Sequence, residues 1–509
     1  MESASTPQLV LPEPDGNINS ERRKLKKSLG RFDILFFLLC TIVGLDTVGT
    51  VASHGPEAFT WMIVLAVIFF VPSAFLCAEL GAAFPQEGGP YLWARLAFGH
   101  LAGSFTAVLY WITTPVWIGG TLSVAALTSF ATFFGDGDLP TGLVFYGATA
   151  AFIWLGVLTA VLSFRIGKWV PIIGGWARLV LLALFSLTVV VYAVEHGLNG
   201  FGAGAFAPSW AGFVGLIPVL MFNYVGFELP SSAGEEMRDP QKDVPFAIFR
   251  SAVLSVLLYS VPVLGILLVL PVDAVTGLSG FLDAVRQVFT VYGGQVQADG
   301  TVELAGAGLV LGGACAVAFA LTLFSSAAAW LMGSDRALAV AGYDGSVPRS
   351  LGVLSERFGT PVRVNVLSGV VATGVLVLTH ELTGGNTAKY FGAVLSLALS
   401  TTLISYLFIF PALPALRSKF PLVERPYRAP WPRVTGTVLT LLIAFATLQL
   451  VAPGLGADWF GADFAPSGWE HGERWAYLAT QGIPLIAIAL LAVVFWAFAA
   501  RTRRAAGGS

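Results

Sequence analysis

Charged side chains are scarce in this 509-residue chain: Asp, Glu, Lys and Arg together make up 11% of it, whereas 56% is hydrophobic. A soluble domain carries about 25% charged residues. The shortage excludes an ordinary water-soluble enzyme and favours a protein that lies in a membrane. The net charge of −2 is uninformative as a sum, because basic and acidic residues concentrate in different parts of the chain.

Cysteine is also rare, and its placement excludes two kinds of site. Cys40, Cys77 and Cys315 each lie alone in an apolar segment, so neither a disulfide framework nor a zinc site is predicted. The histidines lie near the ends of apolar runs without HxxxH or HExxH spacing, and we expect no metal and no cofactor. The chain also lacks the sequence GxxxxGK[ST], so an ATP-driven mechanism is not indicated.

Long apolar runs are present instead. A membrane helix needs about 20 apolar residues, and we count about twelve such runs. They predict an all-α membrane protein whose spans cover residues 32–53, 59–82, 102–134, 142–163, 170–194, 212–233, 246–270, 305–332, 364–379, 390–413, 435–451 and 476–499.

Positive charge predicts the orientation of these spans. Lys and Arg concentrate in alternate connecting segments, and only Arg178, Arg286, Lys389 and Arg474 of the 28 fall elsewhere. Because basic loops stay in the cytoplasm, this alternation predicts a multi-pass protein of the plasma membrane with both termini cytoplasmic. Residues 1–31 lack a short apolar segment with a cleavage site, so we interpret them as a disordered cytoplasmic tail. Residues 501–509 are interpreted as a second cytoplasmic tail.

The first span is interrupted at its centre. Its sequence LFFLLCTIVGLDTVGTVASHG (residues 35–55) places Gly44, Asp46, Thr47, Val48 and Gly49 at mid-depth. Glycine costs a helix interior about 1 kcal/mol relative to alanine. An intramembrane Asp costs about 2.5–3.5 kcal/mol on insertion scales. A simple anchor needs no such cluster, so these five residues are candidate substrate-binding residues.

The sixth span is interrupted in the same way. A glycine, an acid and a proline follow the apolar run 212–224 in the sequence GFELPSSAGEEMRDPQKDVP (residues 226–245). A broken membrane helix is tolerated only where it is buried in protein or lines a wet cavity, and it is the best sequence pointer to a transporter's binding site. The second set of candidate substrate-binding residues is therefore Phe222, Asn223, Tyr224, Gly226 and Glu228.

The two interrupted spans are each the first helix of a group of five. This spacing predicts an inverted repeat of five plus five helices, over residues 32–195 and 211–413, followed by two helices over residues 414–500. At the breaks, freed N–H groups attract carboxylates and freed carbonyls attract ammonium groups. Asp46 either accepts a substrate ammonium or a coupling proton, or it is a structural carboxylate paired with a cation such as Arg178.

Several sequence segments resemble the amino acid–polyamine–organocation (APC) transporters. EEMRDPQKDVPFAI (residues 235–248) is similar to that family's loop after the sixth helix. SDRALAVAGYDGSVPRSLG (residues 334–352) with GTPVRVN (residues 359–365) is similar to its loop after the eighth helix. AELGAAFPQEGGPYLWARLAFG (residues 78–99) and RPYRAPWP (residues 425–432) resemble its segments after the second helix and before the eleventh. The resemblance covers nearly the whole chain and implies the LeuT-like fold with alternating-access transport.

The resemblance also carries expectations for single residues. Phe222 matches an aromatic residue that closes over the substrate, and Glu228 resembles an acid found widely beside the sixth-helix break. The sequence GLDTVG at residues 44–49 departs from the glycine–small–glycine pattern of most members and is closer to the glutamate/GABA-antiporter and polyamine-uptake branches. Arg178 matches the position of a lysine in several proton-coupled members. Because arginine does not deprotonate in practice, it is expected to supply a fixed charge.

We therefore predict a permease, and not an enzyme, that moves an amino acid or a related small amine by alternating access. Its expected partners are that small molecule, the lipid bilayer and a coupling proton or exchanged substrate, with no nucleic acid; it is expected to be a monomer or a homodimer. A polyamine importer and an amino acid exchanger are alternatives. A channel or receptor on a carrier fold is a further class. A membrane-embedded enzyme needs a nucleophile–base pair or a metal cluster at depth, and the sequence offers neither.

Overall fold

The computed structural model describes residues 21–507 apart from residues 22, 26, 163, 298, 299, 452 and 454–468. Most of the predicted tail over residues 1–31 and the last two residues of the tail over residues 501–509 lie outside the described residues. The division into repeats at residues 195 and 211 stays a prediction.

Ten helical segments among the described residues are long and apolar enough to cross a bilayer. Two of them contain a π-helical turn, at Ala66–Phe70 and Ile118–Leu122, where the helix continues without a break. The ten segments are α4 (Pro56–Leu65) with α5 (Val71–Ala83), α7 (His100–Trp117) with α8 (Ser123–Phe134), α9 (Gly142–Val161), α11 (Trp169–His196), α13 (Pro240–Val269), α15 (Gly306–Tyr343), α16 (Val362–Leu382), α17 (Thr387–Ile409) with α18 (Ala412–Lys419), α19 (Pro432–Val451) and α20 (Arg474–Gly507).

The other two predicted spans are the interrupted ones. The first consists of α2 (Arg31–Ile42) and the short α3 (Val48–Ala52), and the sixth consists of α12 (Trp210–Asn223) and the 3-10 helix η4 (Leu229–Glu236). No single piece of either span reaches the length of a membrane helix. The prediction of about twelve helices with the first and sixth interrupted is confirmed.

The second half of the sixth span differs from the predicted restarted helix. It forms 3-10 turns and has a kink at Ala233, where φ is −116° and ψ is 34°. Gly234, next to this kink, disfavours a regular α-helix. Glu228 precedes this element directly, as expected for an acid at the start of a helical segment.

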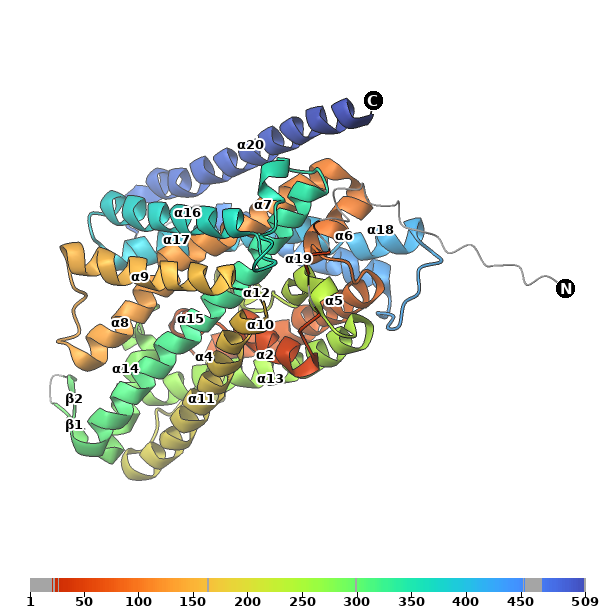
Figure 1. Ribbon diagram of the computed structural model, residues 1–509. Helices are drawn as coiled ribbons and strands as arrows, with labels where there is room; N and C mark the ends of the chain where they lie inside the picture. The colour runs from red at the N-terminus through yellow and green to blue at the C-terminus, as the bar shows by residue number, and fades with distance from the viewer. Residues whose placement is uncertain are drawn as a thin grey trace.

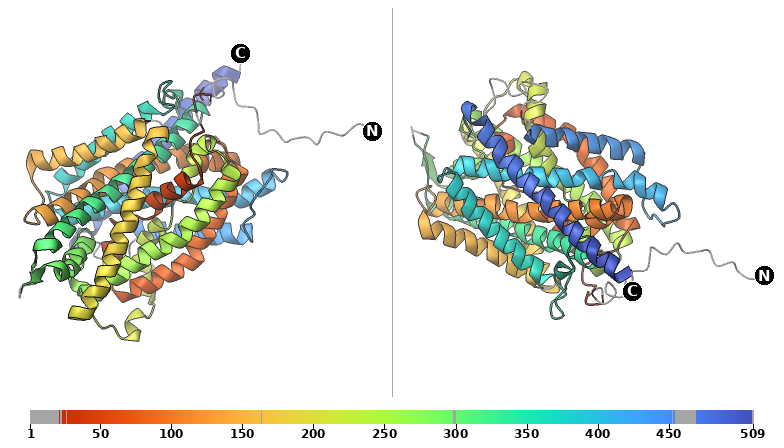
Figure 2. Two further views of the ribbon diagram at one scale, coloured as in Figure 1. Left: turned by 60° about the horizontal axis from the view of Figure 1, so that its bottom comes forward. Right: turned by 90° about the horizontal axis from the view of Figure 1, so that it is seen from above.

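The interrupted helices lie inside the bundle, and the last helix lies outside it (Figure 1). The helix α2 packs against α13, α11 and α15, and α12 packs against α4, α17 and α19. The helix α20 packs on α7 and α17, and Figure 2 shows it crossing the face of the bundle obliquely. This arrangement buries both helix breaks and leaves the lipid-facing surface to long uninterrupted helices.

Shorter elements lie at the two ends of the bundle. One end carries the short helix α14 (Gly280–Phe289) and a hairpin of β1 (Gly294–Val296) and β2 (Val302–Leu304). We call this the hairpin end. The opposite end carries α6 (Gly89–Phe98) and the four-residue α10 (Phe164–Gly167). The eighth span was predicted to end at residue 332, but α15 continues to Tyr343 because the following residues Ala337–Ala341 are apolar and buried.

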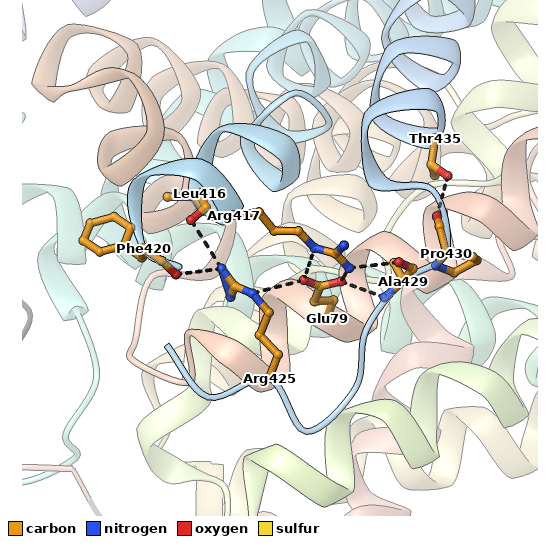
Figure 3. A network of polar contacts seen from close by, with 8 residues as sticks. All are labelled: Glu79, Leu416, Arg417, Phe420, Arg425, Ala429, Pro430 and Thr435. Carbon is orange, nitrogen blue, oxygen red and sulfur yellow. Dashed lines mark hydrogen bonds and ion pairs between the residues drawn. The ribbon is translucent and has the colours of Figure 1, made fainter. Parts of the chain in front are cut away.

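The opposite end, which we call the basic end, is held by ion pairs of Arg31, Lys168, Arg336 and Arg417. One of these clusters joins the end of α5 to the RPYRAPWP segment (Figure 3). The buried Glu79 carboxylate accepts hydrogen bonds from Arg417 Nε (2.8 Å) and from the backbone N–H of Ala429 (2.7 Å), and Arg425 Nε lies 3.5 Å from it. Residues 78–99 and 425–432, two of the segments that resemble the APC transporters, therefore contact each other through Glu79.

Candidate functional site

The first helix break is closed by a tyrosine from another helix. Between α2 and α3 the chain leaves the helical path, and backbone groups lose their helical partners. Tyr259 of α13 donates its hydroxyl to the carbonyl of Ile42 (2.6 Å) and accepts the N–H of Gly44 (2.8 Å). An added Cβ on Gly44 would lie 2.9 Å from an Asp46 side-chain oxygen, so the Asp46 carboxylate would have to shift.

The second break is supported in a similar way and is joined to the first. Thr47 donates its hydroxyl to the side-chain oxygen of Asn223 at 2.8 Å, so one residue from each break meets the other. The N–H of Gly226 donates to the hydroxyl of Tyr406 at 2.9 Å. Gly226 has φ +118°, a conformation that side-chain-bearing residues rarely adopt. These contacts bring the two helix breaks together inside the bundle.

Asp46 is buried in this site without a cation beside it. Its side chain is 1% exposed, and one carboxylate oxygen accepts the indole N–H of Trp117 at 2.8 Å. The other oxygen, Oδ1, has no hydrogen-bond partner among the described residues. A buried ionised carboxylate with an unused oxygen is unfavourable, and a bound proton or an ammonium group removes that penalty.

Glu228, at the sixth-helix break, is also a buried carboxylate with one hydrogen-bonded oxygen. Its side chain is fully buried, and Tyr110 of α7 donates its hydroxyl to Oε1 at 2.7 Å. Its second oxygen is without a hydrogen-bond partner in the described part of the chain, as is the amide nitrogen of Asn223. The two breaks thus contain two carboxylates and an amide with unused hydrogen-bonding capacity.

Aromatic rings connect the two carboxylates. The rings of Trp117 and Trp330 have centroids 6.1 Å apart, and those of Trp330 and Tyr110 have centroids 5.8 Å apart. Phe222 meets Trp117 edge to face at 5.6 Å. We call these four residues the aromatic wall. Aromatic faces attract cations and accommodate aliphatic chains, so this wall suits an amine with an apolar body.

The remaining predicted residues of the breaks are also buried but have other neighbours. Tyr224 donates its hydroxyl to the carbonyl of Met62 (2.8 Å) and stacks on Phe70. Val48 and Gly49 begin α3, and a Cβ on Gly49 would lie 2.7 Å from the carbonyl oxygen of Thr276, in the loop before α14. Their assignment to substrate binding stays a prediction.

Arg178 lies behind the first break. Its fully buried guanidinium donates to the carbonyls of Leu39 (3.3 Å) and Thr322 (3.0 Å) and to the hydroxyl of Ser326 (2.8 Å). It forms no ion pair within 4.0 Å with Asp46, so any balancing of that charge acts over a longer distance. Its predicted role in coupling or charge balance stays a prediction.

Sequence reasoning missed the side chains that other helices contribute. The sequence analysis did not single out Trp117, Tyr110, Tyr259, Trp330 or Tyr406. Each lies in a long apolar helix and carries one polar group that needs a partner when buried. A polar aromatic residue in an apolar helix is therefore a sequence signal for such a role. It does not tell which helix break the residue contacts.

The fold and the site together define a membrane carrier with two interrupted helices that meet at a buried polar centre. The chain belongs to the amino acid permease family, whose model matches residues 29–462. This match confirms the resemblance to the APC transporters and makes the protein a transporter.

Its relatives and structural neighbours agree with that membership. An uncharacterized transporter of Legionella pneumophila is 30% identical, over 80% of this chain and 84% of the relative. A protein of Lactococcus lactis named "Probable agmatine/putrescine antiporter" is 27% identical over 79% and 82%, and the cadaverine/lysine antiporter of Escherichia coli is 24% identical over 68% and 74%. A manganese transporter of Eremococcus coleocola shares the fold, with a TM-score of 0.57 over 97% of both chains at 13% identity.

Proposed function

We propose that this protein is a secondary carrier that moves an amino acid or a small amine across the plasma membrane by alternating access. The observation that supports it best is the contact of Thr47 with Asn223, which places the two helix breaks around one buried centre. An amino acid carries both an ammonium and a carboxylate. The unused oxygens of Asp46 and Glu228 suit the ammonium, and the unused amide nitrogen of Asn223 suits the carboxylate.

The orientation in the membrane is part of the same proposal. Basic loops remain in the cytoplasm, so the basic end is the cytoplasmic end and the hairpin end faces outward. Both described chain ends, near Glu21 and Gly507, belong to segments of the basic end: Glu21 contacts Leu354, and Arg503 packs on Gly345. Energy comes from an exchanged substrate or a proton gradient.

A second candidate is exchange or uptake of a diamine or another cationic amine. The site holds two buried carboxylates, Asp46 and Glu228, neither of which has an ion pair within 4.0 Å among the described residues. The aromatic wall runs between them. A diammonium chain fits this arrangement, with one ammonium at each carboxylate and the methylene groups on the rings. Relatives named as agmatine/putrescine and cadaverine/lysine antiporters favour the same class.

Counterflow in proteoliposomes tests both candidates. Vesicles loaded with unlabelled lysine, alanine, agmatine, putrescine or cadaverine are assayed for uptake of the labelled compound, which needs no assumption about coupling. Saturable uptake of at least one of them supports a carrier. No uptake across the panel by folded protein would contradict the proposed function.

Two substitutions distinguish the candidates. Asp46→Asn and Glu228→Gln keep the shape of each side chain and remove its charge. If a diamine binds both carboxylates, each change lowers diamine affinity at least tenfold and affects a neutral amino acid much less. Asp138→Asn, on an exposed loop, is the matched control. Equal losses of affinity for alanine and cadaverine would contradict the diamine hypothesis.

A further inference from the structure

A cavity of about 610 Å³ lies at the hairpin end, away from both helix breaks. Its walls come from the end of α8, from α14, from both strands of the hairpin and from the start of α15. The hairpin packs on α14 and α15, and Figure 1 shows these elements together at one end of the bundle. The cavity is therefore separate from the substrate site described above.

Two residues of opposite charge line this cavity, Arg286 of α14 and Glu303 of β2. Arg286 is half-buried and donates to the carbonyl of Val302 at 2.6 Å, which holds its guanidinium beside β2. Glu303 is exposed, and neither residue forms an ion pair within 4.0 Å with a described residue. The acid one turn before Arg286, Asp283, accepts the hydroxyl of Ser279 at 2.7 Å. An arginine has five N–H donors and a carboxylate accepts through two oxygens, so both groups keep capacity for a ligand.

An apolar groove of about 730 Å³ adjoins the cavity and lies between α8 and α15. Phe133, Gly135 and Leu309 line both the cavity and the groove. From Leu309 the groove follows α15 as far as Val317, a distance of about 12 Å at 1.5 Å per residue. Its described lining residues are all glycine or apolar, and Gly313 contributes no side chain. A polar cavity is thus joined to an apolar groove.

The groove faces the hydrocarbon of the bilayer. Its lining residues Phe134, Val310 and Val317 are 62%, 72% and 49% exposed, and they belong to two segments that are long and apolar enough to span a membrane. The segment of α8 ends at Phe134 and α15 begins at Gly306, so the cavity lies where these spans reach the membrane surface. Phospholipid headgroups occupy that level, and their acyl chains lie at the level of the groove.

We propose that the cavity and the groove together bind one phospholipid with an ethanolamine headgroup. The phosphate binds Arg286, whose planar fork suits phosphate oxygens, the ammonium binds Glu303, and one acyl chain lies in the groove. Charge complementarity selects this class. A glycerol headgroup leaves Glu303 without a cation beside a negative phosphate, and a choline headgroup has no N–H to donate to the carboxylate. In the proposed orientation the site is in the outer leaflet, and it does not depend on which compound is carried.

Native mass spectrometry of the detergent-purified full chain measures lipid binding without transport. Phosphatidylethanolamine, phosphatidylcholine and phosphatidylglycerol with identical acyl chains are added one at a time. The wild type is expected to bind phosphatidylethanolamine about tenfold more tightly than the other two, the factor that one charge-assisted hydrogen bond supplies. Arg286→Gln is expected to weaken this binding by a similar factor, and Arg286→Lys to weaken it less. Glu303→Gln is expected to abolish the preference for ethanolamine over choline.

Matched controls separate the site from general effects of charge and bulk. Asp273→Asn removes another exposed acid at the hairpin end and should keep the wild-type preference. Ala314→Phe fills the groove from the lipid side and should weaken binding of all three lipids, because the acyl chain loses its place. Ala148→Phe makes the same change on an exposed position of α9, outside the groove, and should leave binding unchanged.

Two results would overturn the proposal. One is equal binding of the three lipids by the wild type, or binding that Arg286→Gln leaves unchanged. The other is tighter binding of phosphatidylglycerol that increases further in Glu303→Gln, which indicates an anionic headgroup instead. If Ala314→Phe does not fold, the substitutions of Arg286 and Glu303 still decide, because both side chains lie at the end of the bundle. A loss of counterflow in proteoliposomes contradicts the carrier function and leaves these binding measurements unaffected.

Discussion

The side chains that stabilise the helix breaks are tyrosines and tryptophans from neighbouring helices. Tyr259 supplies a donor and an acceptor to the first break, Tyr406 an acceptor to the second, and Trp330 donates to the carbonyl of Thr41 at 3.0 Å. Each carries its polar atom at the end of a rigid apolar ring, so it reaches the break without burying a charge. The two unpaired carboxylates remain available for ligands.

Tyr259→Phe tests this role for a single hydroxyl. The change leaves the ring in place but removes both contacts of the first break, and an unsatisfied buried polar group costs about 1–3 kcal/mol. We expect a clearly lower melting temperature of the detergent-purified protein. Tyr146→Phe is the control, because Tyr146 is only half-buried and bonds Glu381 at the hairpin end. Equal melting temperatures for wild type and Tyr259→Phe would contradict this role.

Interruption is the property of the first and sixth helices that positions the site. At the second break the backbone turns at Gly226, where a Cβ would lie 3.4 Å from the carbonyl oxygen of Thr41. At the basic end, α5 is joined to α18 and the RPYRAPWP segment through Glu79. The second break therefore depends on the glycine at position 226, and the contact at the basic end depends on the carboxylate of Glu79.

Gly226→Ala is expected to strain the second break. A side chain at φ +118° costs on the order of 1–3 kcal/mol, so both the melting temperature and the counterflow rate should fall. Gly215→Ala in α12 is the matched control, because nothing lies within 4 Å of the added Cβ and alanine favours helix. A stabilised Gly226→Ala would show that the break does not require glycine.

Glu79→Gln is expected to weaken the contact between α5 and α18. Removing one partner of a buried ion pair lowers the free energy of unfolding by about 3–5 kcal/mol. Because Arg417 is partly exposed, we expect a loss of about 3 kcal/mol or less. Thermal unfolding in detergent measures it. Asp239→Asn removes an exposed pair with Lys242 and should change stability by less than about 1 kcal/mol. Similar effects of the two changes would argue against a structural role for Glu79.

The whole molecule is expected to sit in the membrane with the basic end inside. Cys40, Cys77 and Cys315 are free and buried, so new surface cysteines report on topology without much background. Asp138→Cys, in the loop between α8 and α9, should react with a membrane-impermeant maleimide on intact cells. Ser350→Cys, at the basic end, should react only after permeabilisation. The reverse pattern would invert the proposed orientation.

Much of the fold could be predicted from the sequence because a membrane helix must satisfy its own backbone within one segment. Length and apolarity therefore located the spans, and Gly44, Asp46 and Gly226 marked the breaks. The partners of the breaks could not be predicted, because Trp117 and Tyr259 reach them from helices far away in sequence. The full length of the eighth helix was missed for another reason: residues 334–343 were interpreted as part of a loop, and α15 continues through them.

The most direct test of the central claim is ligand-induced thermal stabilisation of the detergent-purified protein, compared between wild type and Asp46→Asn across all amino acids and common polyamines. Binding to the native state stabilises it by about 2.7 kcal/mol at a ligand concentration of one hundred times the dissociation constant. A carrier whose substrate amine binds at the helix breaks predicts a clear shift with at least one amine that disappears in Asp46→Asn. A shift of equal size in Asp46→Asn, or no shift with any compound at millimolar concentration, would contradict it.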